Sequence, residues 1–207
     1  EGVRRLARGM HAEIGRLGRL VEDLLTLAQF DEGQAELTLQ PTDVERLIEQ
    51  VAAHGRALAS GQRIDTEVAP DLPSITADAD RLQQALLNLL ENALKYTPAD
   101  GRIRLVARLA DDGAASSLLV QVADTGSGVA AEALPHIFDR FYRADVARKR
   151  GNGRPTGAGL GLSIVKSLIE AQGGLVTISS ELGRGTTVTL AFPVASEPRA
   201  VSVARLP

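Results

Sequence analysis

A leucine-rich segment from Arg81 to Tyr96 carries two asparagines four residues apart, Asn88 and Asn92. The leucines recur at helical spacing, so the segment is predicted to form a helix with one face in a core. Asparagine is a poor helix former and is costly to bury without hydrogen-bond partners. Two amides on one face, with Lys95 beside them, indicate a hydrogen-bonding or metal-binding partner. The alternative is a solvated polar face.

The composition narrows the classes of protein. A chain of 207 residues, 44% apolar and 24% charged, suffices for one globular domain and an appendage. A net charge of −3 and an aromatic content of 3% disfavour a nucleic-acid partner. The lack of cysteine excludes disulfides and thiolate metal sites. No membrane-spanning run or signal peptide is found, so a cytoplasmic location is expected, with an inner-membrane anchor before Glu1 left open.

The first thirty residues show a heptad pattern. Apolar residues recur every seven positions in two interleaved series: Val3, Met10, Leu17 and Leu24, and Ala7, Ile14, Val21 and Ala28. This pattern predicts one long helix from about 3 to 30 that packs against another helix, as in a homodimeric bundle. An amphipathic helix lying on its own domain is the alternative.

A separate domain is expected to begin near residue 37. Thr42 and Glu45 have the spacing of a capping box for a helix that ends at about Ala59. A helix capped by Asp78 or Asp80 carries the two asparagines, and a helix at 160–171 is stopped by Gly173-Gly174. Strands are expected at 63–68, 74–77, 102–109, 117–123, 175–180 and 186–192, with a turn at Asp111-Asp112-Gly113. We interpret 143–157 as a mobile basic loop and 195–207 as a loose tail.

The strand at 117–123 runs into Asp124-Thr-Gly-Ser-Gly128. An ionised carboxylate only accepts hydrogen bonds, so Asp124 would pair with the exocyclic amine of adenine and repel the carbonyl oxygen of guanine. Gly126 and Gly128 would let a flat ligand approach the backbone. Asp-Gly pairs are also common at strand-to-turn junctions, so this segment alone stays ambiguous.

The segment Gly157-Ala-Gly-Leu-Gly161 lies just before a predicted helix. Backbone without side chains can approach phosphate oxygens there, and the helix N-terminus offers free N–H groups. A flexible glycine hinge would explain the segment equally well. An amide oxygen on the asparagine helix is a suitable ligand for a magnesium ion, and Lys95 would add a positive charge for phosphates.

The order of these motifs is more informative than any one of them. The chain contains, in order, Asn88-x-x-x-Asn92, Asp124-x-Gly-x-Gly128, Phe138-Asp-Arg-Phe-Tyr-Arg143, Gly157-x-Gly-x-Gly161 and Gly185-Thr186. It resembles the ATP-binding catalytic domain of bacterial two-component sensor histidine kinases, whose N, G1, F and G2 boxes these motifs match. The resemblance implies an α+β fold over residues 37–194, a Bergerat-type α/β sandwich with helices on one face of a mixed sheet. Residues 1–32 resemble the second helix of a dimerisation and phosphotransfer hairpin.

The resemblance also implies a role for each matching residue. Asn92 would hold Mg²⁺, and Asn88 and Lys95 would contact the phosphates of ATP. Tyr96 would lie against the adenine, whose amine Asp124 would bind in a pocket shaped by Gly126 and Gly128. Further contacts would come from Gly157, Gly159, Leu160 and Gly161 around the phosphates, Thr186 at the adenine end, and Arg143 at the terminal phosphate. Phe138 and Phe141 would anchor the lid.

The resemblance implies transfer of the γ-phosphate to a histidine and relay to an aspartate of a response regulator. In the family, that histidine opens a His-Glu/Asp-x-Arg/Lys-x-Pro segment, which His11, His54 and His136 do not match. We therefore expect the acceptor upstream of Glu1. Gyrase and Hsp90 carry a glutamate base at the position of Asn88, and an amide is not a base, so slow ATP hydrolysis is expected. The alternatives are a free-standing ATPase or serine kinase of the same fold, and a non-catalytic nucleotide-sensing dimerisation module.

Overall fold

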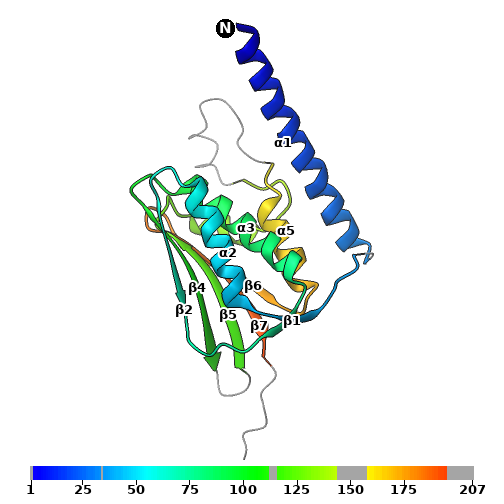
Figure 1. Cartoon of the computed structure of the whole chain (residues 1–207), viewed down its shortest axis with the longest axis vertical. Coiled ribbons are helices and arrows are strands. Elements are labelled where there is room, and N and C mark those ends of the chain that lie inside the picture. The colour runs from blue at the N-terminus through cyan, green and yellow to red at the C-terminus, as the bar shows by residue number, and fades with distance from the viewer. Residues whose placement is uncertain (1, 34, 112–115, 144–157, 195–207) are drawn as a thin grey trace, which may run out of the picture.

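A computed structural model of the chain describes residues 2–33, 35–111, 116–143 and 158–194. Its main sheet contains, in spatial order, β2 (Arg63–Val68), β4 (Arg102–Asp111), β5 (Ser116–Asp124), β7 (Gly185–Pro193) and β6 (Leu175–Glu181). One face of this sheet is covered by the helices α2 (Val44–Leu58), α3 (Ala79–Tyr96) and α5 (Gly161–Glu170) (Figure 1). The remaining elements are α1 (Gly2–Asp31), the small antiparallel pair β1 (Gln40–Thr42) and β3 (Ile75–Ala77), and the 3₁₀ helix η1 (Ala131–His136). The fold is the α+β sandwich that the sequence predicts.

The sheet is mixed and has one wet face. β2 runs parallel to β4, whereas the other neighbouring strands are antiparallel. Ile103, Leu105 and Ala107 of β4 are buried beneath the helices, while the alternate residues Arg102 and Arg104 are exposed. A strand places successive side chains on opposite faces, so this alternation orients the whole sheet.

Helix α3 lies with one side in the core and the other facing away from it. Its buried side chains are Leu82, Ala85, Leu86, Leu89, Leu90 and Ala93. Asn88 and Asn92 are half-buried, and Glu91 and Lys95 are exposed. The helical periodicity of the sequence is therefore confirmed, and the two amides share a face outside the core.

Asp78 connects three parts of the domain. Its carboxylate caps α3 by accepting hydrogen bonds from the N–H groups of Asp80 and Arg81, and it accepts a third from the N–H of Thr38 at 2.9 Å. Its own N–H donates to the side-chain oxygen of Gln172, and the Gln172 amide donates to the carbonyl of Leu168 in α5. Asp78 and Gln172 are both buried, so these hydrogen bonds form away from bulk water.

Most predicted elements are confirmed, with two differences. The prediction of a capping box at Thr42 is wrong: Thr42 ends β1, its buried hydroxyl donates to the Ala77 carbonyl, and Asp43 caps α2 by accepting from the Arg46 N–H. Because this hydroxyl donates to β3, it does not cap α2. The helix η1 was not predicted, because Pro135 lies inside it and no helical periodicity marks it.

Other predictions concern loop and helix ends. The stop at Gly173-Gly174 is confirmed, since the two N–H groups donate to the carbonyls of Glu170 and Ile169 and close α5. The strands β4 and β5 pair as the predicted hairpin, but Asp112 and Gly113 lie outside the described residues. So do 144–157 of the predicted basic loop and the predicted tail at 195–207.

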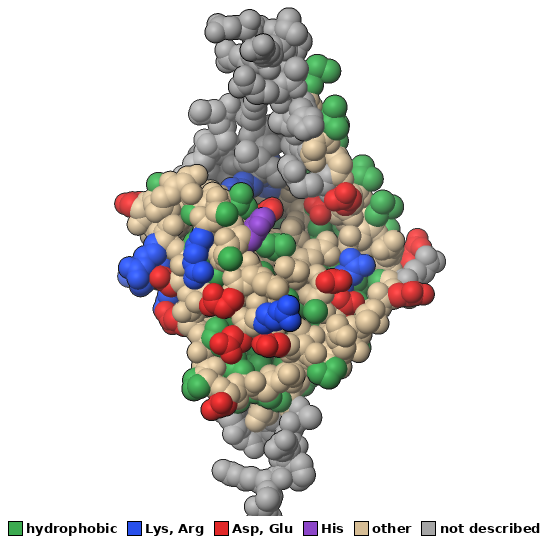
Figure 2. Space-filling view, viewed as in Figure 1, with side chains coloured by type: hydrophobic (Ala, Val, Ile, Leu, Met, Phe, Trp, Pro, Cys, Tyr) green, Lys and Arg blue, Asp and Glu red, His purple; other side chains and the backbone are tan. Residues whose placement is uncertain are grey.

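Helix α1 has two apolar sides. Leu27 is buried and Leu20 and Phe30 are partly buried against the core, where α1 packs on α5. The heptad residues Met10, Ile14, Leu17, Val21 and Leu24 are instead exposed, and green side chains follow the edge of α1 in Figure 2. The C-terminal part of α1 thus lies on its own domain, and pairing of the exposed heptad side with another helix stays a prediction. Across the described part of the chain, no helix has the length and apolar character needed to cross a bilayer.

The Asp78 network predicts a difference between two helix caps. Replacement Asp78→Ala should lower the free energy of unfolding by roughly 1–3 kcal/mol, because it removes the α3 cap and the part-buried hydrogen bond from the Thr38 N–H. Asp43→Ala is the matched control, since Asp43 caps α2 through one exposed hydrogen bond. Urea denaturation measures both. An equal or larger loss for Asp43→Ala would contradict the central role of Asp78.

Candidate functional site

The asparagine face of α3 meets the start of α5. A Cβ placed on Gly161 would lie 3.6 Å from the Asn92 side-chain nitrogen, so Asn92 directly faces the first residue of α5. The cap residue Leu160 offers no side-chain cap, and the first turn contains no acidic residue. The N–H groups of this first turn have no partner within the helix. One side of Asn92 is thus lined by hydrogen-bond donors that favour an anion.

Asp124 lies at the end of β5 with its carboxylate partly shielded from water. Its Oδ1 accepts a hydrogen bond of 2.7 Å from the Gly126 N–H, and the backbone of Thr186 also hydrogen-bonds the carboxylate. Burial raises the pKa of the Asp124 carboxyl above its usual 3.8, although both hydrogen bonds act in the opposite direction. The carboxylate therefore carries its charge at a desolvated position.

The loop after Asp124 is fixed between α3 and the β6–β7 turn. The Ser127 N–H donates to the Tyr96 carbonyl at the end of α3, and the Ser127 carbonyl accepts from the Gly183 N–H. Gly128 has a φ of 64°, and a Cβ there would lie 2.0 Å from the Glu181 carbonyl oxygen. Only glycine fits such an approach. The loop containing Gly126 and Gly128 consequently joins the C-terminal end of α3 to the end of β6.

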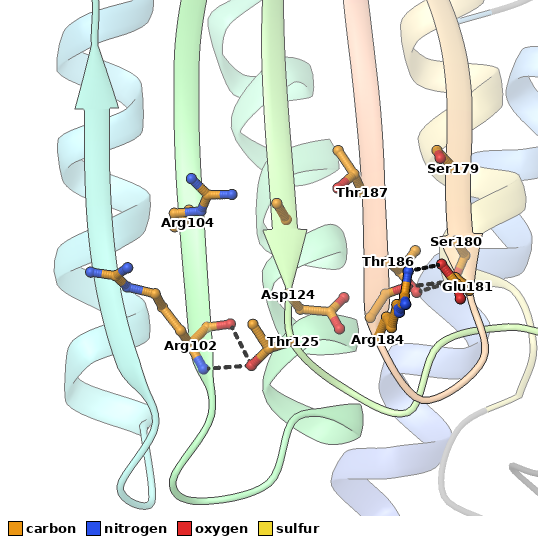
Figure 3. Close-up of a pocket in the computed structure, with 12 residues that line it drawn as sticks. Arg102, Arg104, Asp124, Thr125, Ser179, Ser180, Glu181, Arg184, Thr186 and Thr187 are labelled. Atoms are coloured by element: carbon orange, nitrogen blue, oxygen red, sulfur yellow. Dashed lines mark hydrogen bonds and ion pairs between the residues drawn. The ribbon is translucent and has the colours of Figure 1, made fainter.

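A cavity of about 520 Å³ opens at this end of the sheet. Figure 3 shows the side chains that line it, with the Asp124 carboxylate pointing toward Thr186 on the neighbouring strand. Arg102 and Arg104 reach it from the wet face of the sheet, and each is engaged with an acidic side chain of β2, Asp65 and Glu67 respectively. Arg104, Ala123, Thr187 and Ser179 form one cross-strand row of this lining, on the wet face. Asp124 instead pairs with the buried Ile103, so its side chain lies on the helix side of the sheet and the cavity lies mainly on the other side.

The motif that ends at Arg143 and the glycine segment before α5 are joined by backbone. The Phe141 N–H donates to the Gly159 carbonyl at 2.9 Å, and Phe141 adopts a φ of 62° with a largely exposed ring. A positive φ is uncommon for a bulky residue and requires support from its surroundings. This hydrogen bond therefore holds Phe141 beside the segment that leads into α5.

The structure brings most of the predicted site residues together. Asn88, Asn92, Lys95 and Tyr96 follow one another along α3, and the Lys95 ammonium lies 4.7 Å from the centre of the Tyr96 ring. Arg143 is half-buried two residues beyond Phe141, and Gly157 lies outside the described residues. The roles of these residues toward a ligand remain predictions. The described residues contain no cluster of three His, Asp or Glu side chains that could hold a metal.

Two residues at this site were not predicted from the sequence. Gly185 has a φ of 116°, and a Cβ there would lie 1.9 Å from the Asp124 carbonyl oxygen, which explains the glycine of the Gly-Thr pair. Ser180 of β6 contacts both Gly185 and Thr186. The Gly-Thr pair was a usable signal for Gly185, whereas nothing in the sequence around Ser180 distinguishes it from Ser179.

Comparison with known proteins identifies the family. Residues 77–196 match the family described as histidine kinase-, DNA gyrase B- and HSP90-like ATPase. The chain belongs to this family. The match includes α3, Asp124, the start of α5 and the β6–β7 turn, and it confirms the predicted resemblance and fold.

The relatives are sensor proteins. The chain is 38% identical over 196 residues to the sensor protein DivL of Caulobacter vibrioides, covering 93% of this chain and 24% of DivL. It is 35% identical over 182 residues to the sensor protein SrrB of Staphylococcus aureus, covering 87% of this chain and 30% of SrrB. The chain thus spans less than a third of the length of these relatives.

Solved structures agree with this family assignment. The crystal structure of full-length ShkA in complex with AMPPNP matches with a TM-score of 0.76 and 38% identity, over 94% of this chain and 40% of ShkA. The mycobacterial sensor histidine kinase MprB matches with a TM-score of 0.64 and 27% identity, over 74% of this chain and 97% of the MprB chain. The chain therefore contains a catalytic domain of the type found in sensor histidine kinases.

The shifted pKa of Asp124 predicts a pH-dependent stability difference. A raised folded-state pKa means that the ionised carboxylate destabilises the unliganded fold at neutral pH and that this cost disappears as pH falls below the usual pKa. Asp124→Asn should accordingly be more stable than the wild type at neutral pH, with the gap closing as the solution is acidified.

Urea denaturation at a series of pH values measures the gap. Asp100→Asn serves as the control, because Asp100 is an exposed carboxylate in the loop after α3. A gap that stays constant with pH, or one that widens on acidification, would contradict the buried charge at Asp124.

Proposed function

We propose that this domain binds Mg²⁺-ATP between α3 and α5 and transfers the γ-phosphate to a histidine carried by a segment outside this sequence. The observation that carries the proposal is the arrangement along α3. Asn92 faces the N-terminus of α5, while the loop after Asp124 contacts the carbonyl of Tyr96. Asn88 and Tyr96 are eight residues apart, or roughly 12 Å along a helix, which suits a nucleotide lying lengthwise.

Each end of this side of α3 favours a different part of ATP. Free N–H groups at the start of α5 would bind phosphate oxygens, and Asp124 would accept a hydrogen bond from the adenine amine. The complex of ShkA with AMPPNP supports this ligand, because that protein is 38% identical to this chain. Asn92 fits a magnesium site through its amide oxygen, and a bound Mg²⁺ would offset negative charge on the phosphates.

The residues on α3 favour phosphotransfer over hydrolysis. A water molecule needs a general base to become a good nucleophile, and the half-buried amide of Asn88 cannot accept a proton. An imidazole nitrogen attacks phosphorus with its own lone pair and needs no such base. His54 is exposed on α2, and His136 is held by Asp139 at 3.0 Å. We assign the acceptor role to neither of them.

We also propose that residues 1–32 belong to a dimerisation and phosphotransfer hairpin, that residues 37–194 form the catalytic domain, and that a response regulator receives the phosphate. The exposed heptad side of α1 supports pairing with a second copy, because five large apolar side chains along one helix face are costly to leave in water. The sequence similarity to the sensor proteins DivL and SrrB supports the proposal that this chain is part of a signalling protein.

Phosphotransfer is tested with γ-labelled ATP and the longer native chain that contains the rest of the hairpin. The wild-type chain should acquire label that is lost in acid and kept in base, as expected for phosphohistidine. Asn92→Ala should lower labelling by roughly 10- to 100-fold, because it removes the amide that would hold Mg²⁺. Gln50→Ala is the matched control, since Gln50 carries the same functional group on the exposed side of α2.

Other outcomes separate the alternatives. Binding of ATP without any labelled histidine would favour a nucleotide-sensing module. Rapid release of inorganic phosphate by the isolated domain would favour a free-standing ATPase and reject the assignment of Asn88.

Pairing through α1 is tested by charging the heptad side. Ile14→Glu combined with Val21→Glu should convert a dimer to a monomer, because both exposed side chains lie on the predicted seam. Sedimentation velocity measures the change. Glu22→Lys together with Glu32→Lys is the control, because it alters charge at exposed polar positions of α1 and the residue after it. A wild-type chain that stays monomeric at high concentration would reject the pairing.

A further inference from the structure

Ser180 lies in the same cross-strand row as Asp124 and Thr186. Thr186 pairs with Asp124 on one side and with Ser180 on the other, so the three side chains lie on one face of the sheet (Figure 3). The Ser180 hydroxyl makes three contacts. It lies 2.9 Å from the Val129 N–H nitrogen, 2.8 Å from the Gly185 carbonyl oxygen and 2.9 Å from the Thr186 hydroxyl.

The direction of each hydrogen bond follows from the available protons. A hydroxyl has one proton to donate and two lone pairs that accept. The Val129 N–H can only donate and the Gly185 carbonyl can only accept, so Ser180 accepts from the first and gives its single proton to the second. The remaining bond must run from the Thr186 hydroxyl to Ser180. The opposite direction would leave two oxygens 2.8 Å apart with no proton between them.

We propose that Ser180 is a positioning residue that makes Thr186 an acceptor toward the purine. This inference rests on the proposed binding of ATP at Asp124. With its proton committed to Ser180, the Thr186 hydroxyl presents only lone pairs beside the Asp124 carboxylate. Two neighbouring acceptors match the two N–H bonds of the adenine 6-amino group. They repel a 6-carbonyl oxygen, which has no proton to donate.

The site therefore selects the purine by exclusion as well as by attraction. A carbonyl at the 6-position would point its lone pairs at these acceptors and leave at least one of them without a donor, and sites built on hydrogen bonds reject such ligands. Without Ser180, the Thr186 hydroxyl could turn its proton toward the ligand and pair with that carbonyl. Ser180 thus contributes to discrimination without touching the base.

The test compares ATP with inosine triphosphate, which replaces the 6-amino group by a carbonyl and lacks the 2-amino group of guanine. Binding of each magnesium complex is measured by calorimetry, and the readout is the ratio of the two dissociation constants. Ser180→Ala should lower this ratio roughly three- to tenfold, chiefly by tightening inosine triphosphate. Ser180→Thr keeps the hydroxyl and should retain the wild-type ratio.

Ser117→Ala is the matched control, because Ser117 lies on the neighbouring strand β5 at the end far from Asp124. Thr186→Val gives an independent sign test that does not depend on the folding of Ser180→Ala. If the Thr186 hydroxyl accepts a hydrogen bond from the purine, its removal in Thr186→Val lowers the preference for ATP over inosine triphosphate. If the hydroxyl donates to the purine, its removal raises that preference. A raised preference in Thr186→Val would overturn the inference, as would a wild-type ratio in Ser180→Ala.

Failure of the proposed function would look different. A wild-type chain that binds neither nucleotide, or an Asp124→Ala variant that holds ATP as tightly as the wild type, would reject nucleotide binding at Asp124. A wild-type chain that prefers ATP, together with a lost preference in Asp124→Ala and an unchanged ratio in Ser180→Ala, would reject the role of Ser180 alone.

Discussion

The distance between the asparagine helix and the start of α5 depends on the buried contact between Asp78 and Gln172. Asp78 begins α3 and Gln172 follows the end of α5, so their hydrogen bond aligns the two helices antiparallel. An antiparallel pair places the far end of α3, with Asn92, beside the first residue of α5, as observed at Gly161. A polar network about three to four helical turns away therefore helps to set the geometry of the proposed phosphate end. Buried networks suit this task because every member is satisfied in only one arrangement.

The proposed purine end, at Asp124, is built on a less favourable arrangement. Burial raises the pKa of Asp124, which shows that the protein holds a charge where water would hold it better. The hydrogen bonds from Gly126 and Thr186 offset part of that cost, and the close approach of Gly185 to the Asp124 carbonyl locks β7 beside it. A ligand amine would supply the donor that the carboxylate lacks. Under the proposed function, the stability lost through burial of this carboxylate would be recovered as binding free energy, a common arrangement in functional sites.

The features predicted correctly from the sequence are those that local sequence patterns determine. Leucine periodicity predicted α3, alternation predicted the strands, and the order of glycine motifs predicted their convergence. The capping residue of α2 was predicted wrongly because the Thr42 hydroxyl donates to the Ala77 carbonyl across the β1–β3 pair. That hydrogen bond joins residues 35 positions apart, which local patterns do not reveal. Ser180 was missed for the same reason. Its partner Val129 lies 51 positions away, and although Thr186 is only six residues away across the β6–β7 turn, no pattern in the sequence shows that the two hydroxyls meet. Local patterns thus revealed the residues proposed to touch a ligand, and only tertiary contacts revealed those that position them.

Among the described elements, helix α1 contacts the rest of the domain mainly through α5. Its buried residue Leu27 packs beside α5, and such burial contributes roughly 1.5–3 kcal/mol. The ion pair between Asp31 and Arg140 adds little, because side-chain exposures of 47% and 44% leave it screened by water and salt. Arg140 belongs to the same motif as Phe141, whose backbone is bonded to Gly159. Movement of α1 would therefore act first on the segment joined to the start of α5, where the proposed phosphate site begins.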